Sequence, residues 1–290
     1  MRTLNIIGCG SVGQTLGRLW AAHNVFELQC VLNRSLASGQ RAVEFVGSGR
    51  AIERHEQLEP ADAVMISTRD DAIEPSCREL CRTGVLRPGA VVFHCSGSLP
   101  STVLEPAASH GARLASLHPV KSFAQPEQAV ATFAGTYCAL EGDAEACAFL
   151  RLVLQECGAE VFFVRPEAKT IYHAATVFSC NYLVALLEVA LRCFEKADVP
   201  RETALRIIEP IVGGTVENVF RLGTVEALTG PIARGEVAVV SEQCQVLGRW
   251  DDSVRRIYQA LGQIAADLSA DQRHAGPEDL AAIREILECK

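Results

Sequence analysis

Residues 1–20 read MRTLNIIGCGSVGQTLGRLW, and this stretch decides the fold class. The apolar residues 4–7 predict a strand, and residues 11–22 have the spacing of a helix. Between the two lies the spacing G-x-G-x-x-G, formed by Gly8, Gly10 and Gly13. The spacing alone is weak evidence, but here it follows an apolar strand and opens a helix, which is the context that the motif requires.

This glycine-rich turn predicts a site for a dinucleotide. Gly8 would allow the tight turn, Gly10 would let the backbone approach a pyrophosphate, and Gly13 would let helix and strand pack closely. Ser11 and Val12 would place the N-terminus of the helix, with its partial positive charge, against the phosphates. The alternative is a strand–turn–helix that binds nothing, and the context favours the cofactor.

The residues after the second predicted strand indicate which dinucleotide is bound. An NAD-binding chain would usually carry Asp or Glu here to hold the ribose hydroxyls, whereas this chain has Asn33, Arg34 and Ser35. Arg34 can pair with a 2′-phosphate, and its two neighbours can donate hydrogen bonds to it. We therefore predict NADPH as the cofactor, the alternative being a solvent-facing arginine in a loop.

Two further loops each follow an apolar strand. Ligands of such sheets bind at the carboxyl ends of the strands, so Ser67 and Thr68 should lie beside the dinucleotide. Ser96, in the second loop, should approach the nicotinamide. His94 by itself is better explained as a buried structural histidine than as a functional group.

The first half of the chain continues this alternation of short apolar strands and helices. Further strands are predicted at 26–32, 63–67, 90–94, 113–117, 137–140 and 160–164. Strands this apolar, separated by helices, imply a parallel sheet covered on both faces. From residue 166 the pattern is almost wholly helical, with a long helix at 169–196. We expect an α/β chain with a doubly wound cofactor-binding domain at 1–165 and an all-helical substrate and dimerisation domain at 166–290.

Composition narrows the classes of function. Hydrophobic residues make up 49% of the 290 residues, which is globular, and a net charge of −8 without a Lys/Arg run argues against nucleic acid. The 12 cysteines include no C-x-x-C pair, so no metal site is expected. The chain opens directly into a strand and no apolar stretch is expected to reach transmembrane length. We therefore expect a cytoplasmic protein with a small-molecule substrate and no membrane partner.

The helix that begins at Lys169 holds polar side chains within an apolar run. A reductase must deliver hydride to a carbonyl or imine carbon, and a cation or proton donor must meet the charge that develops. Lys169 and His173 are four residues apart and share a face, and Asn181 lies eight further on at the edge of that stripe. We predict these three as catalytic, against the alternative that each is a satisfied polar group of a buried helix or, for Lys169, a surface charge.

Four other residues are candidates for substrate binding. His118 and Lys121 follow a predicted strand and could face a cleft between the domains, or could belong to an ordinary ordered loop. In the helical half, Thr229 could cap a helix, and Arg234 could anchor a substrate carboxylate or stabilise a domain interface.

Five segments carry a resemblance to a known family: GCGSVG at 8–13, HCSGS at 94–98, SLHPVKSF at 116–123, YHAATVFSCNYLVALL at 172–187 and ALTGPIARG at 227–235. Over nearly its whole length, the chain resembles proteins that join a Rossmann-like domain to a helical domain of uncharacterised function. Their architecture is similar to that of 6-phosphogluconate dehydrogenase, pyrroline-5-carboxylate reductase and ketopantoate reductase relatives. Where that superfamily often carries Lys-x-x-x-Asn on the first long helix of its second domain, this chain has Lys169-x-x-x-His173.

The resemblance implies an NADPH-linked reduction of a branched 2-oxo acid, since some members of the family are alternative ketopantoate reductases in pantothenate synthesis. Our leading hypothesis is a 2-oxo acid reductase, with ketopantoate as the best single substrate, Lys169 or His173 as proton donor and Asn181 orienting the substrate. A cyclic imine reductase and a non-catalytic NADP-binding regulatory protein are the alternatives. The apolar helices exceed what a small domain can bury, so we expect a homodimer through the helical domain.

Overall fold

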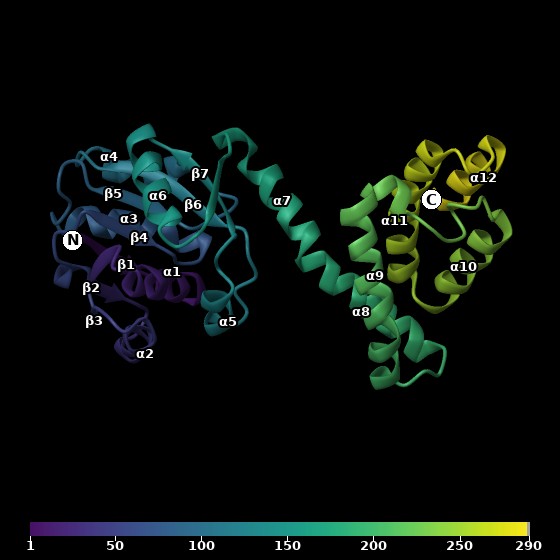
Figure 1. Ribbon diagram of the computed structural model, residues 1–290, viewed down its shortest axis with the longest axis horizontal. Helices are drawn as coiled ribbons and strands as arrows, with labels where there is room; N and C mark the ends of the chain where they lie inside the picture. Colours follow the sequence, from purple (N-terminus) through teal and green to yellow (C-terminus); the bar gives the residue numbers. More distant parts are fainter. Residues whose placement is uncertain (289–290) are drawn as a thin grey trace. The chain divides into compact units, whose positions relative to one another are not determined.

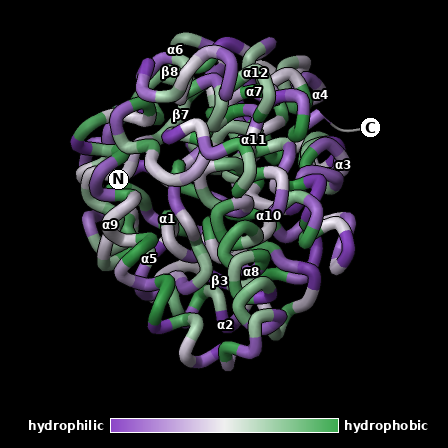
Figure 2. Tube along the Cα trace, turned by 90° about the vertical axis from the view of Figure 1, so that its right-hand side faces the viewer, coloured by the Kyte–Doolittle hydropathy of each residue, from purple (hydrophilic) through white to green (hydrophobic). Residues whose placement is uncertain are grey.

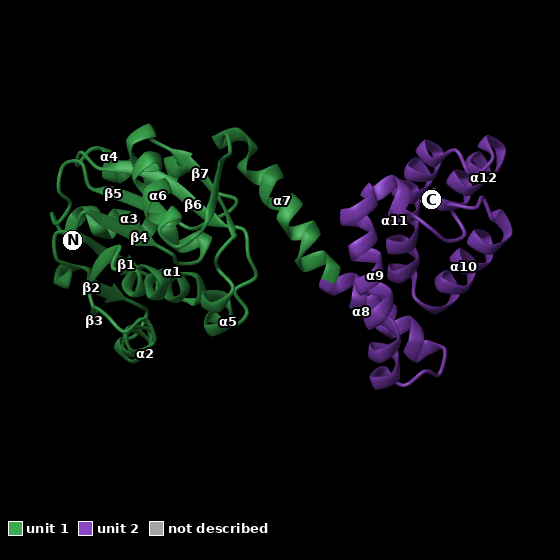
Figure 3. Ribbon diagram, in the orientation of Figure 1, with its two compact units in different colours: residues 1–183 green, residues 184–290 purple. Residues whose placement is uncertain are grey.

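The computed structural model describes residues 1–288, and the chain divides into two compact units. The first unit comprises residues 1–183, and the second begins at Val184 (Figure 3). The division falls inside a helix, α8 (Asn181–Lys196), whereas the last strand of the chain ends at Phe163. The predicted boundary at 165 marks the change from strand to helix, and as a limit between domains it stays a prediction.

The first unit is built on one eight-stranded sheet in the order β3-β2-β1-β4-β5-β6-β7-β8 (Figure 1). Its strands are β1 (Arg2–Ile7), β2 (Phe26–Leu32), β3 (Arg50–Ile52), β4 (Ala63–Ile66), β5 (Val91–His94), β6 (Arg113–Pro119), β7 (Tyr137–Gly142) and β8 (Glu160–Phe163). Neighbouring strands are parallel from β3 to β6, β7 is antiparallel to β6, and β8 is parallel to β7. The carboxyl ends of β1, β2, β4, β5 and β6 therefore lie along one edge of the sheet.

Alternate side chains of the central strands enter two separate cores. In β4, Met65 packs into one core with helices α1 (Ser11–Ala22) and α6 (Ala144–Gln155), whereas Ile66 packs into the other with α3 (Asp70–Arg82). Because helices cover both faces, as Figure 1 shows, each strand must be apolar along its whole length. The predicted doubly wound sheet is confirmed.

Several short elements of this unit have no counterpart among the predicted ones. They are α2 (Leu36–Val46), the edge strand β3, the 3-10 helices η1 (His55–Gln57) and η2 (Ser101–Leu104), and helices α4 (Glu105–Ala108) and α5 (Pro126–Ala131). Strand β3 has three residues, too few to show an alternation in the sequence.

The rest of the chain is helical, as predicted. It contains η3 (Pro166–Ala168), α7 (Lys169–Ser179), α8, α9 (Arg201–Ala227), α10 (Val237–Trp250), α11 (Asp252–Gln272) and α12 (Pro277–Leu287). The single long helix expected at 169–196 is in fact two helices, because Cys180 leaves the helical conformation with φ −123° and ψ −67°. Asn181 therefore begins α8 instead of continuing the face of α7 that carries Lys169.

The expectation that residues 169–196 form a buried helix is wrong for the single chain. Of these residues, all of which are described, only Lys169 and Leu191 are buried. Figure 2, coloured by hydropathy, shows the apolar residues of α8 along the trace. The buried residues of the second unit gather in two small clusters, Leu191 with Ala204 and Ile208, and Val240 with Ile283 and Leu287.

One segment also contradicts the expectation that no stretch is long enough to cross a membrane. Residues 166–196 are long and apolar enough to do so, by length and composition alone. A single segment of this kind is weak evidence for a membrane, because a helix that packs against other protein passes the same test.

Candidate active site

The glycine turn has the geometry that the motif predicts. Gly8 has φ +83°, its N–H donates to the Leu32 carbonyl at 2.7 Å, and an added Cβ would lie 2.8 Å from the Thr68 nitrogen. A Cβ on Gly13 would lie 2.7 Å from the Ser67 hydroxyl oxygen. A Cβ on Gly10 would meet nothing within 4 Å. Two glycines thus permit close packing within the protein, and Gly10 alone faces open space, where a pyrophosphate could approach.

The helix behind this turn is suited to an anion. Helix α1 starts at Ser11 with Gly10 as its N-cap, no side chain caps it, and its first turn contains no acidic residue. The backbone N–H groups around Ser11 and Val12 therefore remain available to donate to a ligand. The positive end of the helix dipole would also attract an anion there.

Of the three residues predicted to hold the 2′-phosphate, two have other roles in the structure. The carboxamide of Asn33 accepts from the Cys9 N–H at 2.6 Å and donates to the Cys9 carbonyl at 3.4 Å, so it holds the glycine turn in place. The Ser35 hydroxyl caps α2 by accepting from the Ser38 N–H at 3.3 Å. Arg34 is exposed and, among residues 1–288, forms no ion pair or side-chain hydrogen bond. Arg34 is thus the member of this trio that is free to bind a phosphate.

The loops after β4 and β5 are ordered by their own serines. The Ser67 hydroxyl donates to the Gly8 carbonyl at 2.7 Å, which ties the end of β4 to the glycine turn. The buried Ser96 hydroxyl donates to Asp70 at 2.8 Å and accepts from the Leu99 N–H at 3.0 Å. Both serines lie at the predicted edge of the sheet, where they shape the backbone of the site. The neighbouring Thr68 hydroxyl donates to the adjacent carbonyl of Arg69 at 3.2 Å.

His94 lies at the end of β5 and is completely buried. Its Nε2–H donates to the Pro100 carbonyl at 3.1 Å, and its Nδ1 accepts from the Ser96 N–H at 3.1 Å. Both ring nitrogens are used within the protein, which matches the structural explanation favoured from the sequence. Burial, more than any neighbour, lowers the pKa of His94 to about 4, so the ring is neutral near pH 7.

This histidine should make the fold sensitive to acid. The unfolded chain takes up the proton near pH 6.5 and the folded chain only near pH 4, so stability is complete above pH 6.5 and falls towards pH 4. The shift corresponds to roughly 3 kcal/mol. Denaturant unfolding at several pH values should show that His94→Gln, which keeps a donor and does not titrate, loses less stability over this range than the wild type. Equal losses would contradict the assignment.

Three side chains meet beside Gly97, in the loop after β5. His118 comes from β6, and Tyr172 and His173 come from α7; we call these three residues the imidazole cluster. The His118 Nδ1 lies 2.7 Å from the Tyr172 hydroxyl, and the rings of His118 and His173 meet edge to face with centroids 5.4 Å apart. A Cβ on Gly97 would lie 2.8 Å from His118 Nε2 and would also collide with His173 Nδ1. The cluster therefore requires glycine at this position.

Lys169 lies beneath the same loop. It is 2% exposed, and its ammonium donates to the Ser96 carbonyl at 3.1 Å and to the Ser116 hydroxyl. Burial lowers the pKa of Lys169, while the carboxylates of Glu141 and Asp70 act in the opposite direction. Lys169 and His173 are thus brought to one loop, as their spacing predicts, with Lys169 inside the protein and the imidazole cluster nearer its surface.

The other predicted substrate residues are not in this cluster. Lys121 is half-buried and donates to the Thr132 carbonyl at 2.8 Å. Asn181 and Thr229 are exposed, the latter in the second unit. Arg234, also in the second unit, forms an ion pair with Glu236 at 2.6 Å.

Sequence reasoning missed one member of this site, Tyr172, and favoured a functional role for the loop that contains Gly97 without giving Gly97 itself a role. Tyr172 adjoins His173 at the start of α7. Two adjacent polar side chains near the start of an apolar helix could have indicated from the sequence that Tyr172 belongs to the site. Gly97 lies between two serines, and only the approach of His118 and His173 shows why it has no side chain.

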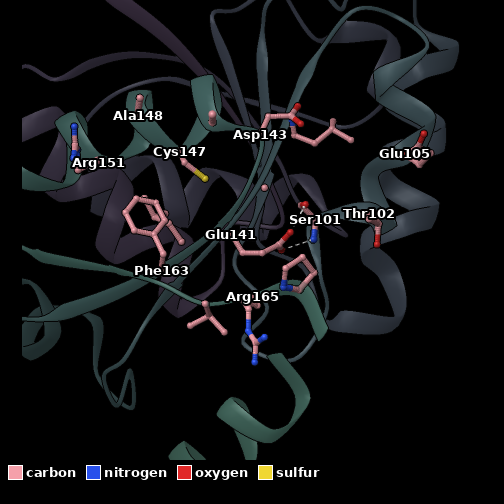
Figure 4. Close-up of a pocket in the computed structure, with 16 residues that line it drawn as sticks. Ser101, Thr102, Glu105, Glu141, Asp143, Cys147, Ala148, Arg151, Phe163 and Arg165 are labelled. Atoms are coloured by element: carbon pink, nitrogen blue, oxygen red, sulfur yellow. Dashed lines mark hydrogen bonds between the residues drawn. The ribbon is translucent and has the colours of Figure 1, made fainter. Parts of the chain in front are cut away.

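A separate hollow of about 790 Å³ lies in the first unit near the ends of β7 and β8 (Figure 4). There the Glu141 carboxylate accepts from the N–H and the hydroxyl of Ser101, both at 2.7 Å. Phe163 and Arg165 line the same hollow. None of the predicted site residues lines it, and the glycine turn lies at a different edge of the sheet. We therefore place the candidate active site at the glycine turn and the imidazole cluster, where polar groups converge, and not at this hollow.

Two family models match the chain. A Rossmann-like domain matches residues 2–119, and a domain of unknown function, DUF2520, matches residues 136–265. No curated protein matches the sequence.

Several solved structures share the fold. A candidate NADP oxidoreductase, BF3122 from Bacteroides fragilis, is 21% identical with a TM-score of 0.75, covering 91% of this chain and 97% of its own. Protein TM1727 from Thermotoga maritima is 24% identical with a TM-score of 0.73, covering 93% and 99%. An imine reductase from Myxococcus stipitatus, in complex with NADP+, is 18% identical with a TM-score of 0.66, covering 99% and 100%. At these identities the likeness establishes the fold.

Proposed function

We propose, for a chain that joins a Rossmann-like domain to a DUF2520 domain, that it is an NADPH-dependent reductase of a small carbonyl compound. One observation carries the proposal. The open glycine turn follows β1, and the imidazole cluster surrounds the loop after β5, so both belong to the same edge of the sheet. Ligands of doubly wound sheets bind at this edge, and a hydride donor there would lie near groups able to hold a proton.

Arg34 supports NADPH over NADH, because it is exposed beside the end of β2 and has no other partner among residues 1–288. Arg34→Ala should raise the Kd for NADPH about 10- to 100-fold, since a hydrogen-bonded charge contributes roughly 1.5–3 kcal/mol, and should leave the Kd for NADH unchanged. Fluorescence titration of both cofactors measures this. Arg87→Ala, an exposed arginine before β5 at the opposite edge of the sheet, is the control. Equal losses for both cofactors would refute the 2′-phosphate contact.

The substrate we propose first is a 2-oxo acid, with ketopantoate as the best single candidate. Asn181 would orient it, and Lys121, Thr229 or Arg234 would bind its polar groups. The imidazole cluster is better placed than Lys169 to donate the proton, because the Lys169 ammonium is buried and bonded to Ser96 and Ser116.

A cyclic imine is the second candidate substrate. Pyrroline carboxylate reductase from Plasmodium falciparum and the imine reductase share this fold, with TM-scores of 0.57 and 0.66. Burial lowers the pKa of His118 to about 4, and a neutral His118 suits a substrate that arrives already protonated.

The assay that tests the function is loss of NADPH absorbance with ketopantoate, then with a panel of 2-oxo acids and cyclic imines. Turnover with one class identifies the substrate. Tight NADPH binding without turnover on any of them would contradict a reductase and favour the non-catalytic regulatory alternative.

The eleven cysteines among the described residues are all free, which supports our placing the reaction in the reducing cytoplasm.

We also propose that two chains associate through α8 and α9. Apolar side chains of these helices are exposed in the single chain, among them Val184 at 67%, Ile211 at 59% and Phe220 at 87%. The two small clusters of the second unit bury few residues, so a second copy would supply the missing core.

Sedimentation should find a dimer. Phe220→Asp should shift it towards monomer, because a charge would be buried at the interface, whereas Leu152→Asp, which replaces a 51% exposed residue of α6, should not. A monomeric wild type would contradict the interface.

A further inference from the structure

The contact between Tyr172 and His118 joins residues 54 positions apart in the chain. The Tyr172 ring is half-buried and packs edge to face on His118 at 5.6 Å and on Phe162 at 5.9 Å between centroids. Its hydroxyl has one acceptor within hydrogen-bond distance among residues 1–288, His118 Nδ1 at 2.7 Å. A half-buried hydroxyl needs an acceptor for its proton, so this geometry favours Tyr172 as the donor.

The direction of this bond fixes the tautomer of His118. If Nδ1 accepts from Tyr172, the ring proton of the neutral imidazole sits on Nε2. That nitrogen faces the loop after β5, since a Cβ on Gly97 would lie 2.8 Å from it. Because residue 97 is a glycine, the His118 N–H donor and the His173 ring can both lie close to the backbone of this loop.

His173 contributes a second fixed ring. The Thr176 hydroxyl donates to the His173 carbonyl at 2.8 Å, so its oxygen is left to accept from His173 Nδ1 at 3.2 Å. The His173 ring is thereby held edge-on against His118, and it confines the direction in which His118 Nε2 can point.

We propose that Tyr172 is the proton source of the reduction and delivers its proton through His118. The inference rests on the proposed reductase function, and it replaces a single proton donor with a two-residue relay. Tyr172 and His118 act as one unit, and glycine at position 97 lets the His118 and His173 rings pack against the loop.

The relay balances charge and protons. When bound, NADPH supplies the hydride whose electron pair forms the new C–H bond, and the displaced C=O pair leaves a negative oxygen on the substrate. That oxygen takes the proton of His118 Nε2. As this N–H bond breaks, Tyr172 gives its proton to Nδ1, so the imidazole stays neutral. The charge ends on the Tyr172 oxygen. Before the next turnover, His118 Nε2 takes a proton from water and Nδ1 returns its proton to the Tyr172 oxygen, which restores the starting tautomer.

The electrostatics of the cluster explain why His118 needs Tyr172. Burial first, and then electrostatic interaction with His173 and Lys169, lowers the pKa of His118 to about 4, so near pH 7 the ring has no extra proton to give. Burial raises the pKa of Tyr172 to about 12, which keeps its hydroxyl protonated. An alkoxide is a stronger base than a phenolate, so transfer towards the substrate is downhill.

The tautomer can be measured without turnover. Long-range proton–nitrogen NMR spectra show which ring nitrogen carries the proton, and His118→Asn assigns the His118 signals among the seven histidines. We expect the Nε2–H tautomer in the wild type and its loss in Tyr172→Phe. An Nδ1–H tautomer in the wild type, or spectra unchanged by Tyr172→Phe, would overturn the relay.

Kinetics test the proton transfer itself. Tyr172→Phe should lower kcat for a carbonyl substrate about 100-fold, leave the Kd for NADPH unchanged, and add little to the loss in His118→Asn. Reduction of a preprotonated imine should hardly change. Tyr137→Phe, which removes the hydroxyl of a 59% exposed tyrosine of β7, is the control and should match the wild type.

The two proposals fail differently. Wild-type carbonyl reduction by Tyr172→Phe would overturn the relay and leave the reductase standing. A wild type that reduces nothing would refute the reductase, and the NMR tautomer would still decide whether Tyr172 donates to His118.

Discussion

Gly10→Ala should weaken NADPH binding roughly 10- to 100-fold while leaving the fold intact, since forcing one extra carbon into a tight contact typically costs about 1–3 kcal/mol. The new methyl group would meet nothing within 4 Å in the protein. The backbone of Gly10, at φ −83° and ψ −158°, is accessible to alanine. The space that the methyl group would occupy is the space through which a pyrophosphate must approach, so the whole effect should fall on the cofactor.

Gly8→Ala is the matched comparison, and its effect should fall on the fold. Gly8 has φ +83°, and its Cβ would lie 2.8 Å from the backbone nitrogen of Thr68. A left-handed backbone costs about 1–2 kcal/mol and overpacking adds about 1–3, so unfolding should be easier by several kcal/mol. Thermal unfolding and NADPH titration of both variants separate the two effects. Wild-type affinity in Gly10→Ala would show that no phosphate passes this turn.

The elements that could be predicted are those fixed by local chemistry. Strand β2 and helix α1 have the predicted bounds, 26–32 and 11–22, because each is a continuous apolar or periodic run. The open side of the glycine turn also follows from spacing and context, since it depends on residues 8–13 alone.

The interior of the site depends on contacts distant in sequence and could not be predicted in the same way. Asn33 was assigned to a phosphate because of its place after β2, but its carboxamide reaches back 24 residues to Cys9. Tyr172 reaches His118 across 54 residues, and no spacing rule connects them. For Lys169, the sequence predicts that its side chain shares a helix face with His173, four residues on. The sequence does not predict that the Lys169 ammonium is buried beneath the Ser96 carbonyl.

The break in the predicted long helix has a similar cause. An apolar run of helical spacing from 169 to 196 does not show that Cys180 leaves the helical conformation. The apolar composition of the same run predicts burial, but hydropathy does not say what covers the helix. In the single chain nothing covers most of it, and this is the observation on which the proposed dimer depends.

Gly97→Ala should lower kcat about 100-fold, the scale of loss that follows a misplacement of about 1 Å at a reacting group. The new methyl group would lie 2.8 Å from His118 Nε2 and would collide with His173 Nδ1. Gly97 is buried and has no left-handed backbone, so alanine adds bulk without backbone strain. The rings must move, and a shift of His118 alone would disturb its 2.7 Å contact with the Tyr172 hydroxyl.

The affinity for NADPH and the thermal stability of Gly97→Ala serve as controls for its loss of activity. Gly97 is not part of the glycine turn, so the Kd for NADPH should stay near that of the wild type, and the melting temperature should fall only modestly. In a His118→Asn background, Gly97→Ala should cost little more, because residues that act as one unit are not additive. Steady-state kinetics of the two single variants and the double variant decide the matter. Full activity in Gly97→Ala would mean that the reacting atoms do not approach the imidazole cluster, and the proton would then have to come from elsewhere.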